Sequence, residues 1–559
     1  MKKILDIQHL SIQFKNGKQL TTAVDDISFS VAENQFTAIV GESGSGKSLT
    51  ALSILQLLPS AATVTGRVLF SDADGVQDIL TCATKKLLSL RGNRIAMVFQ
   101  EPMTALNPLM TCGKQVAEVL VKHLGLNKAN AKAKAIELFT DVELPQPSDI
   151  YDRYPHQISG GQKQRVMIAM AIGCNPALLI ADEPTTALDV VVQKNIMELL
   201  KKMQQKHQLT VLMITHDIDL VATIADEVLV MYKGKIIEKG MASTVLKHPS
   251  HPYTKALIAC KPSANKKGKP LPILEEGMMS EIENTAIFFP KKTTAEKQDK
   301  LLLSIRDLTV AFPAKKNIWG KAMSMHTAVN KVSLYVNQNE IVGLVGESGC
   351  GKTSLGNAIL QLVEPVSGSI ELNGKLLTKN TAHIWGKEIQ MVFQDPYSSL
   401  HPRLKIGDAI MEPMKVHRLF GSASRRKEKT IDLLEQVGLS SDSFGRYPHQ
   451  FSGGQRQRVC IARALAMEPS FMVFDESVSA LDVSMQAQVL NLINELKQSH
   501  QFTALFISHD LSVIHYISDR IYVMKSGEIV ETGNANDIFN NPQHEYTREL
   551  IGCITGNDG

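Results

Sequence analysis

Two glycine-rich stretches have the residue types and the spacing of a phosphate-binding loop. The first is GESGSGKS at 41–48, and the second is GESGCGKT at 346–353. Glycines allow successive N–H groups to turn inward, the helix that follows adds partial positive charge, and the lysine adds a full charge. One match could be an accidental glycine-rich turn, but two matches predict two phosphate-binding sites. The candidate residues are Gly41, Ser43, Gly44, Gly46, Lys47 and Ser48 in the first loop and Gly346, Ser348, Gly349, Gly351, Lys352 and Thr353 in the second.

Carboxylate pairs follow two apolar, strand-like runs. These pairs are Asp182-Glu183 and Asp475-Glu476. Such apolar runs suit the middle of a parallel sheet, at whose carboxyl edge a phosphate loop also emerges. The aspartate of each pair can hold Mg²⁺ through water, and the hydroxyl residue at the end of each loop can ligate the same ion. The glutamate can accept a proton from an attacking water. Plain surface charge is the alternative, which the apolar run before each pair disfavours.

Glutamines and histidines also recur at strand ends. Gln100 and Gln394 each follow Met-Val-Phe, and an amide there can orient a metal-bound water. The alternative is a strand-end amide that bonds to the backbone. His216 and His509 each end a later strand-like run. A lone histidine after a strand is usually structural, but the recurrence beside the same sheet edge predicts a contact with a γ-phosphate.

A Ser-Gly-Gly-Gln stretch begins a long helix-like segment in each half of the chain. Glycines at a helix start expose N–H groups, which makes a second anion-binding terminus. Serine is also a good N-cap, so capping of its own helix is the alternative role. The residues concerned are Ser159, Gly160, Gly161 and Gln162, and Ser452, Gly453, Gly454 and Gln455.

These residues require particular elements around them, and the elements occur twice. Residues 36–40 are typical of a short β-strand and 49–55 of a helix, so the first loop is expected to join a strand to a helix. The same spacing of 293 residues separates Ser159 from Ser452, Asp182 from Asp475 and His216 from His509. A constant spacing over such a length indicates two copies of one domain. We expect a first domain at 1–262, a linker at 263–300 and a second domain at 301–559.

Length and composition limit the function classes. The 559 residues exceed what one hydrophobic core usually supports. The net charge of +4 is small and spread out, which gives no support to nucleic-acid binding. Seven cysteines without a Cys-x-x-Cys pair indicate reduced thiols instead of zinc ribbons. No apolar run approaches a membrane span and the start lacks a secretory signal, so a cytoplasmic protein is expected.

Taken together, the motifs resemble two fused nucleotide-binding domains of the ABC ATPase family. The resemblance implies an α/β fold in which each P-loop domain has a RecA-like core sheet, an antiparallel β subdomain and a helical subdomain. It implies ATP and Mg²⁺ as ligands. Glu183, His216, Glu476 and His509 would be catalytic, and the ion would be held by Ser48, Gln100, Asp182, Thr353, Gln394 and Asp475. Phe14 and Phe312 fall where the family stacks an aromatic ring on adenine, although core packing explains either residue nearly as well.

The family also implies how the two halves act together. Its domains face each other head to tail, so each ATP lies between the phosphate loop of one domain and the Ser-Gly-Gly helix of the other. One chain could therefore build both sites without a second copy. The departures from the family pattern remove no charged or hydrogen-bonding group, so we expect two hydrolytically competent sites.

The branch is indicated by two C-terminal motifs, HPYTKAL at 251–257 and HEYTREL at 544–550. They resemble the C-terminal motif of oligopeptide, dipeptide and nickel importer ATPases. The first half looks like the D-type subunit of that branch and the second like its F-type. The resemblance implies two integral membrane permeases and, through them, a substrate-binding protein, with this chain peripheral on the cytoplasmic face of the inner membrane.

Two other function classes are the alternatives to import. A soluble tandem ABC protein that acts on ribosomes or DNA would need a long charged helical linker, zinc cysteines or a basic surface, none of which is visible in the sequence. An efflux or lipoprotein-release ATPase is disfavoured by the Tyr-Thr motifs. The cargo is left open among peptides, nickel, opines and peptide antibiotics.

Overall fold

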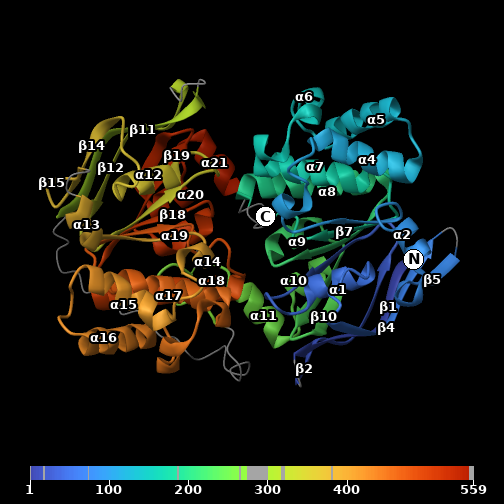
Figure 1. The fold of residues 1–559 in the computed structure, drawn as a ribbon, viewed down its shortest axis with the longest axis horizontal. Helices are drawn as coiled ribbons and strands as arrows, with labels where there is room; N and C mark the ends of the chain where they lie inside the picture. Colours follow the sequence, from blue (N-terminus) through green and yellow to red (C-terminus); the bar gives the residue numbers. More distant parts are fainter. Residues whose placement is uncertain are drawn as a thin grey trace. The chain divides into compact units, whose positions relative to one another are not determined.

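The computed structural model describes residues 2–16, 19–72, 75–185, 188–263, 266–273, 300–316, 322–378 and 382–552. These residues form two compact units (Figure 1). The described residues up to Leu188 and from Val192 to Ala259 belong to the first unit. Those from Cys260 onward, together with Asp189–Val191, belong to the second.

The first unit is built on a six-stranded sheet in the order β10-β9-β3-β8-β7-β6. All neighbouring strands are parallel except β10, which is antiparallel to β9. Every residue of β3, β7 and β8 is buried, because apolar side chains pack on both faces. The strands are β3 (Phe36–Val40), β6 (Ile95–Val98), β7 (Leu178–Asp182), β8 (Thr210–Thr215), β9 (Glu227–Tyr232) and β10 (Lys235–Met241).

A second, antiparallel sheet covers one face of the core sheet in the order β2-β1-β4-β5. Its apolar side chains form one hydrophobic cluster with Leu178, Ile180 and Leu212 of the core strands. The strands are β1 (Lys3–Asn16), β2 (Gln19–Ala32), β4 (Ala62–Asp72) and β5 (Gly75–Asp78).

Helices complete the first unit, and α4 to α7 form a group of their own (Figure 1). They are α4 (Cys112–Leu124), α5 (Lys128–Asp141), α6 (Pro147–Asp152) and α7 (Gly160–Ile172). The others are α1 (Lys47–Ile54), α2 (Thr84–Leu90), α3 (Pro102–Ala105), α8 (Val190–His207), α9 (Ile218–Ile224), α10 (Ala242–Lys247) and α11 (Pro252–Ala259). Short 3-10 turns occur at Ile79–Thr81 and Pro155–Gln157.

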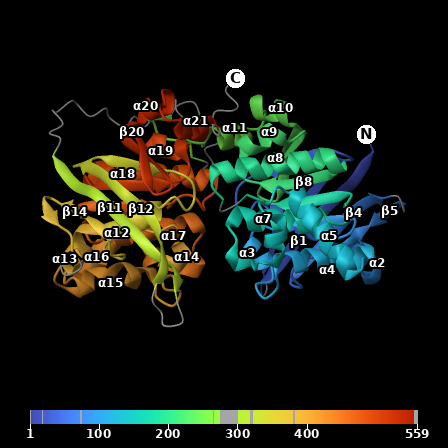
Figure 2. The same ribbon diagram turned by 90° about the horizontal axis from the view of Figure 1, so that it is seen from above.

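The second unit repeats this plan, with a core sheet in the order β16-β17-β18-β13-β19-β20 and an antiparallel sheet in the order β12-β11-β14-β15. Figure 2 shows α15, α16 and α17 grouped as their counterparts are. The strands are β11 (Leu301–Lys316), β12 (Ala322–Asn337), β13 (Ile341–Val345), β14 (Ser367–Leu372), β15 (Lys375–Leu376), β16 (Ile389–Val392), β17 (Phe471–Asp475), β18 (Thr503–Ser508), β19 (Arg520–Lys525) and β20 (Glu528–Asn534). The helices are α12 (Lys352–Ile359), α13 (Ala382–Glu388), α14 (Pro396–Ser399), α15 (Ile406–Val416), α16 (Ala423–Gln436), α17 (Gly453–Leu465), α18 (Val483–His500), α19 (Leu511–Ile517), α20 (Ala535–Asn540) and α21 (Glu545–Gly552), with 3-10 turns at Ser441–Gly445 and Pro448–Gln450.

The predicted α/β fold is confirmed, with a core sheet, an antiparallel sheet and a helical group in each unit. The predicted strand at 36–40 is β3, and the predicted helix begins two residues early, at Lys47. Within the described residues no helix has the length and apolar character needed to cross a membrane.

Part of the predicted linker packs on the second unit. The side chain of Asn491, on α18, bonds to both the N–H and the C=O of Leu271, at 2.9 and 2.8 Å. The Tyr516 hydroxyl donates to the carbonyl of Lys269, and the Lys267 ammonium donates to the carbonyl of Ser518. Residues 266–273 are therefore attached to α18 and to the end of α19, whereas 274–299 lie outside the described residues.

Candidate functional site

The first phosphate loop connects β3 to α1 at the carboxyl edge of the core sheet, and the second connects β13 to α12. Gly46 and Gly351 precede the helices with φ of 100° and 109°, a left-handed conformation that favours glycine. A Cβ on Gly46 would lie 2.8 Å from the carbonyl oxygen of Ala23, and one on Gly351 would lie 2.1 Å from that of Ala328. Side chains are excluded there, so the loop backbone itself forms the cradle.

The loop lysine is buried and points back to the start of the loop. Lys47 Nζ donates to the carbonyl oxygens of Gly41 and Glu42, at 2.9 and 2.7 Å. Lys352 makes the same two bonds in the second loop, each 2.8 Å long. The ammonium group is thus positioned by backbone oxygens inside the loop, as a phosphate ligand requires.

The loop hydroxyl meets the aspartate at the end of the neighbouring carboxylate strand. Ser48 Oγ donates to Asp182 Oδ1 at 2.9 Å, and Thr353 Oγ1 donates to Asp475 Oδ1 at 3.2 Å. Both aspartates are buried, at the ends of β7 and β17. Their oxygens belong to the donor class that Mg²⁺ prefers.

The glutamate, the glutamine and the histidine also come together. Gln100 Nε2 donates to Glu183 Oε2 at 3.0 Å, and His216 Nδ1 lies 3.4 Å from the same oxygen. Both glutamine and histidine therefore contact one carboxylate oxygen and fix how the glutamate is oriented. The backbone of Glu183 has φ of 44°, an uncommon conformation for a side-chain-bearing residue and one that clusters at active sites.

The second unit reproduces this arrangement closely. Gln394 Nε2 donates to Glu476 Oε2 at 2.9 Å, and His509 Nδ1 lies 3.5 Å from that oxygen. Lys352 Nζ lies 3.9 Å from the other carboxylate oxygen. Glu476 shares the left-handed backbone, with φ of 45°.

Burial and neighbouring charges divide the carboxyl groups into two kinds. Burial raises the pKa of Asp182 and of Asp475 to about 6, although the loop hydroxyl and lysine lower it in part. Burial also acts on Glu476, but the nearby His509 and Lys352 outweigh it and lower the pKa of this carboxyl. Glu476 therefore stays ionised at neutral pH, as a proton acceptor must.

The Ser-Gly-Gly-Gln stretches begin α7 and α17 with a capping box. Gln162 N–H donates to Ser159 Oγ at 3.3 Å, and Ser159 N–H donates to Gln162 Oε1 at 3.0 Å. Ser452 and Gln455 make the same two bonds at 3.3 and 3.1 Å. The structure thus shows the capping role, and a nucleotide contact by Gly160, Gly161, Gly453 and Gly454 stays a prediction.

The two candidate adenine-stacking residues lie on the antiparallel sheets. Phe14, on β1, is half-buried and packs against the hydrophobic cluster of the first unit. Phe312, on β11, is 37% exposed. Core packing accounts for Phe14 in this structure, so its contact with a base stays a prediction, as does that of Phe312.

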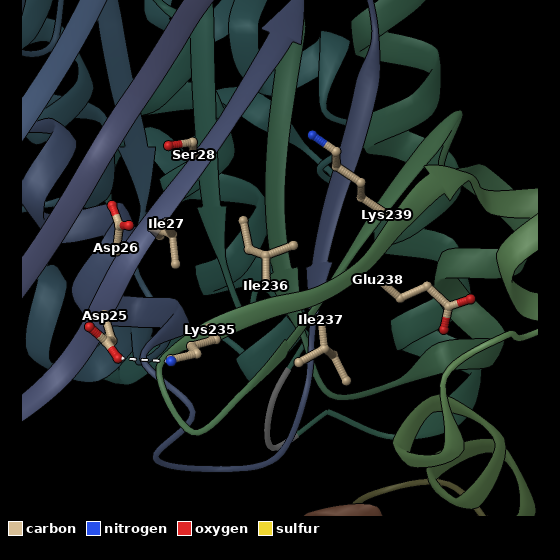
Figure 3. A pocket seen from close by; sticks show the side chains of 9 residues that line it. All are labelled: Asp25, Asp26, Ile27, Ser28, Lys235, Ile236, Ile237, Glu238 and Lys239. Carbon is tan, nitrogen blue, oxygen red and sulfur yellow. Dashed lines mark ion pairs between the residues drawn. The ribbon is translucent and has the colours of Figure 1, made fainter.

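A hollow of 480 Å³ beside β2 and β10 contains none of the predicted site residues (Figure 3). It is lined on one side by Asp25, whose carboxylate pairs with Lys235 at 3.2 Å. The chemistry-bearing residues gather instead at the carboxyl edge of each core sheet.

Comparison with known proteins agrees with this geometry. The ABC transporter family model matches residues 24–186 and 329–479. The chain belongs to the ABC transporter family. A second model, the C-terminal region of oligopeptide/dipeptide transporters, matches 237–286 and 530–559.

Curated relatives of this ABC protein match it over nearly their whole length. The glutathione import ATP-binding protein GsiA of Pectobacterium atrosepticum is 43% identical over 99% of this chain and 90% of its own. GsiA of Escherichia coli strain K12 is 43% identical over 99% of this chain and 89% of its own. The chain is thus an ATP-hydrolysing subunit of the oligopeptide/dipeptide importer branch, and the transport interpretation is favoured over an action on ribosomes or DNA.

ATP, the ligand of ABC cassettes, fits the two loops of this ABC protein. A Cβ on Gly41, Gly46, Gly346 or Gly351 would lie 2.8 Å or less from a backbone oxygen, and a buried lysine lies inside each cradle. Mg²⁺ fits the paired hydroxyl and carboxylate oxygens. In the part of the chain that the structure describes, no group of three or more His, Cys, Asp or Glu residues could hold a metal by itself. An ion at these oxygens would need phosphate oxygens and water to complete its coordination.

Sequence reasoning missed one contact of the ABC loops. Tyr253 and Tyr546, in the C-terminal motifs, each reach the backbone of a phosphate loop. From the sequence, this motif indicates only the importer branch. The sequence also shows that the tyrosines belong to the repeat, since 293 residues separate them as they separate the aspartates Asp182 and Asp475, but it does not indicate their contact with the loop.

Proposed function

We propose that both units bind ATP with Mg²⁺ and hydrolyse it, and that hydrolysis drives import of peptide-type substrates through membrane permeases. The convergence of the loop lysine, hydroxyl, aspartate, glutamate, glutamine and histidine in each unit carries this proposal. Because the two constellations have the same contacts, both sites are proposed to be competent.

Different residues are proposed to hold the ion and to bind the phosphates. Ser48, Gln100 and Asp182 would hold the ion in the first unit, and Thr353, Gln394 and Asp475 would do so in the second. The ion would neutralise phosphate charge when bound. Lys47 and Lys352 provide a fixed positive charge for the phosphates.

Glu183 and Glu476 are proposed as the general bases. Each places its carboxylate, which can accept a proton, at the sheet edge, and glutamine and histidine orient one of the carboxylate oxygens. A histidine in this position can also donate to a phosphate oxygen, because Glu183 outweighs the effect of burial and raises the pKa of His216.

The proposal is tested by Glu183→Gln and Glu476→Gln, made separately and together. Gln keeps the size of the side chain but cannot take a proton, so each single variant should lose at least half of the ATPase rate. The double variant should lose about 100-fold, the usual contribution of a general base. Glu137→Gln, on the exposed side of α5, is the control. A single variant with an unchanged rate would refute the claim that its site turns over.

We further propose that the two halves of the chain pair, so that each nucleotide contacts the loop of one half and the Ser-Gly-Gly start of the other. The capping box supports this role, because the serine and glutamine satisfy only part of the N–H groups that a helix start presents. Ser452→Tyr should abolish ATP-dependent closure, measured as distance change between spin labels placed on α4 and α15. Closure that persists in this variant would contradict the pairing.

Partner proteins are proposed to be two integral membrane permeases, with a substrate-binding protein reached through them, at the cytoplasmic face of the inner membrane. The two units expose apolar side chains at equivalent positions of the repeat, with exposed fractions between 38% and 64%. The pairs are Leu57 and Leu362, Phe99 and Phe393, and Met103 and Tyr397.

A groove of 440 Å³ adjoins these positions in the second unit. Its lining includes Leu362, Trp385, Phe393 and Pro413, between the core sheet and the helical group. An apolar groove lined by Phe393, which precedes Gln394 in the chain, suits a short permease helix, because a movement of Gln394 would shift the Glu476 carboxylate that it contacts.

Membrane association tests this surface. Leu57→Glu with Leu362→Glu should release the protein from membranes that contain its permeases, while ATP binding in solution is retained. Val76→Glu with Leu376→Glu is the control, because these apolar residues are also exposed, at 66% and 51%, but lie on the antiparallel sheets. Release of the control variant to the same degree would show that the surface is not specific.

The cargo is proposed to be a short peptide, and glutathione is the first candidate because the relatives import it. Uptake of labelled glutathione, dipeptides and oligopeptides is compared in a strain that lacks this chain. Uptake of glutathione that is unaffected by the deletion would remove it as cargo.

A further inference from the structure

The tyrosine of each C-terminal motif is buried against a phosphate loop. Tyr253 is fully buried, and its hydroxyl accepts a hydrogen bond from the N–H of Glu42 at 3.1 Å. Tyr546 is 2% exposed and accepts from the N–H of Glu347 at 3.0 Å. The same contact thus joins residues about 200 positions apart in both units.

This contact fixes one peptide group of the loop from both ends. The peptide between Gly41 and Glu42 presents its N–H to Tyr253 and its carbonyl to Lys47, at 3.1 and 2.9 Å. If the peptide rotated, the carbonyl would leave the ammonium group. The tyrosine hydroxyl therefore acts on the lysine through the backbone.

The tyrosine is itself held by the strand and the motif around it. Glu238, on β10, accepts from the N–H groups of Ser250 and His251, at 2.7 and 3.2 Å. His251 Nδ1 accepts from the N–H of Tyr253 at 3.1 Å. Figure 3 shows the Glu238 side chain extended away from the Asp25–Lys235 side of β10.

The second unit has the same supports. Glu531, on β20, accepts from the N–H groups of Gln543 and His544, at 2.7 and 3.1 Å, and His544 Nδ1 accepts from Tyr546 N–H. The packing on the ring differs: Tyr232 lies against Tyr253 with centroids 4.3 Å apart, whereas Lys525 Nζ lies 4.6 Å from the ring centre of Tyr546. The hydrogen bonds are repeated although the ring neighbours are not.

We propose that Tyr253 and Tyr546 are positioning residues for ATP binding, and that the C-terminal region of this branch acts as a brace that preorganises the phosphate loop. The proposal rests on the binding of ATP at these loops. Burial raises the pKa of Tyr546, so its hydroxyl remains protonated and neutral beside the loop. A neutral acceptor orients the Glu347 N–H without placing a negative charge near the phosphates.

The first test needs no nucleotide. Tyr253→Phe removes only the hydroxyl, and amide hydrogen exchange is followed in peptides that contain Glu42 and Glu347. Loss of one neutral hydrogen bond, worth about 1 kcal/mol, corresponds to about a fivefold change in an equilibrium constant. Exchange at Glu42 should therefore rise about fivefold while that at Glu347 stays constant, and Tyr546→Phe should do the reverse.

The second test measures nucleotide affinity. In a Lys352→Ala background, so that the first loop is observed alone, Tyr253→Phe should raise the Kd of a fluorescent ATP analogue about fivefold. Tyr232→Phe is the matched control, because it keeps the ring contact and removes a hydroxyl that has no bond to the loop among those described. Its Kd should not change.

Each outcome decides the proposal. Faster exchange at Glu42 with a higher Kd supports it. Unchanged exchange overturns the brace, whatever the ATPase rate. A lower Tm with unchanged Kd would make the tyrosine an ordinary core residue and would also overturn it. Failure of the analogue to bind even the parent background would count against ATP binding at the loop, whereas the exchange result would still report on the brace.

Discussion

Asn491 makes two of the hydrogen bonds that attach residues 266–273 to the second unit, and Asn491→Leu should weaken this attachment. Asn491 is 4% exposed and Leu271 is 2% exposed. The amide of Asn491 satisfies both backbone groups of Leu271 and also accepts from the Tyr516 hydroxyl at 3.0 Å. Leucine has the same branched arrangement of side-chain heavy atoms and is larger than asparagine, so the substitution removes the hydrogen bonds without opening a cavity.

The magnitude follows from these contacts. Each hydrogen bond contributes about 1 kcal/mol net, so the two bonds to Leu271 contribute about 2 kcal/mol. If the segment stayed in place, its unpaired N–H and C=O would cost about 1–3 kcal/mol each. Undocking avoids that cost but gives up burial of the Leu271 side chain, about 2 kcal/mol. A loss of about 2 kcal/mol predicts that the Leu271 amide loses roughly 30-fold of its protection from hydrogen exchange.

Hydrogen exchange measured on peptides that cover 266–273 tests this prediction. The Leu271 amide should exchange about 30-fold faster in Asn491→Leu, with the rest of the second unit unchanged. Glu198→Leu is the matched control, because Glu198 occupies the equivalent, exposed position on α8 of the first unit. Protection that is equal in parent and Asn491→Leu would refute the claim that this side chain holds the segment.

Three further predictions concern single residues. Ser48→Ala should weaken Mg²⁺-dependent nucleotide binding roughly tenfold. The substitution removes the charge-assisted hydrogen bond to Asp182, worth about 1.5 kcal/mol, and an oxygen ligand for the ion. Nucleotide titration without Mg²⁺ should show no such effect. Gly407→Ala places a Cβ 2.4 Å from the Phe444 ring and should destabilise by about 1–3 kcal/mol, whereas Gly445→Ala, which meets nothing within 4 Å, should leave Tm unchanged. At Glu238 burial raises the pKa, but hydrogen bonds from neighbouring hydroxyl and N–H groups outweigh it and lower the pKa from 4.5 to about 2. Its stabilisation is complete above about pH 4.5 and is lost as the pH falls toward 2, so Glu238→Gln should reduce the loss of stability between pH 7 and pH 3.5 in urea titrations.

Most of the chemistry could be predicted from the sequence because it depends on short motifs at strand ends. The loop glycines, Lys47 and Asp182 each follow an apolar run that predicts a strand. Parallel strands bring their carboxyl ends to one edge, so the motifs had to meet. The strand order in each sheet was not predicted, because periodicity alone does not set it, and a helical group such as α4 to α7 was expected only from the family resemblance.

Contacts between distant segments could not be predicted in this way. No local pattern indicates that Tyr253 meets Glu42, or that Leu271 meets Asn491. Both depend on tertiary packing of side chains whose types suit many other places. The capping role of Ser159 was predictable, because an N-cap is determined by residues three positions apart.

The two copies of the domain distinguish contacts that both phosphate loops share from contacts that only one unit makes. Within each unit the lysine, the aspartate and the tyrosine brace keep the same hydrogen bonds, so these contacts are demanded by the loop itself. One difference between the units lies on α18 and α19. Asn491 and Tyr516, which hold residues 266–273, are replaced by Glu198 and Thr223 at the equivalent positions of the first unit. Because an ionised carboxylate accepts hydrogen bonds but donates none, Glu198 cannot make the pair of bonds to a backbone N–H and C=O that the Asn491 amide makes. The fused chain thus keeps two matching sites for ATP while only one half has the side chains that hold residues 266–273.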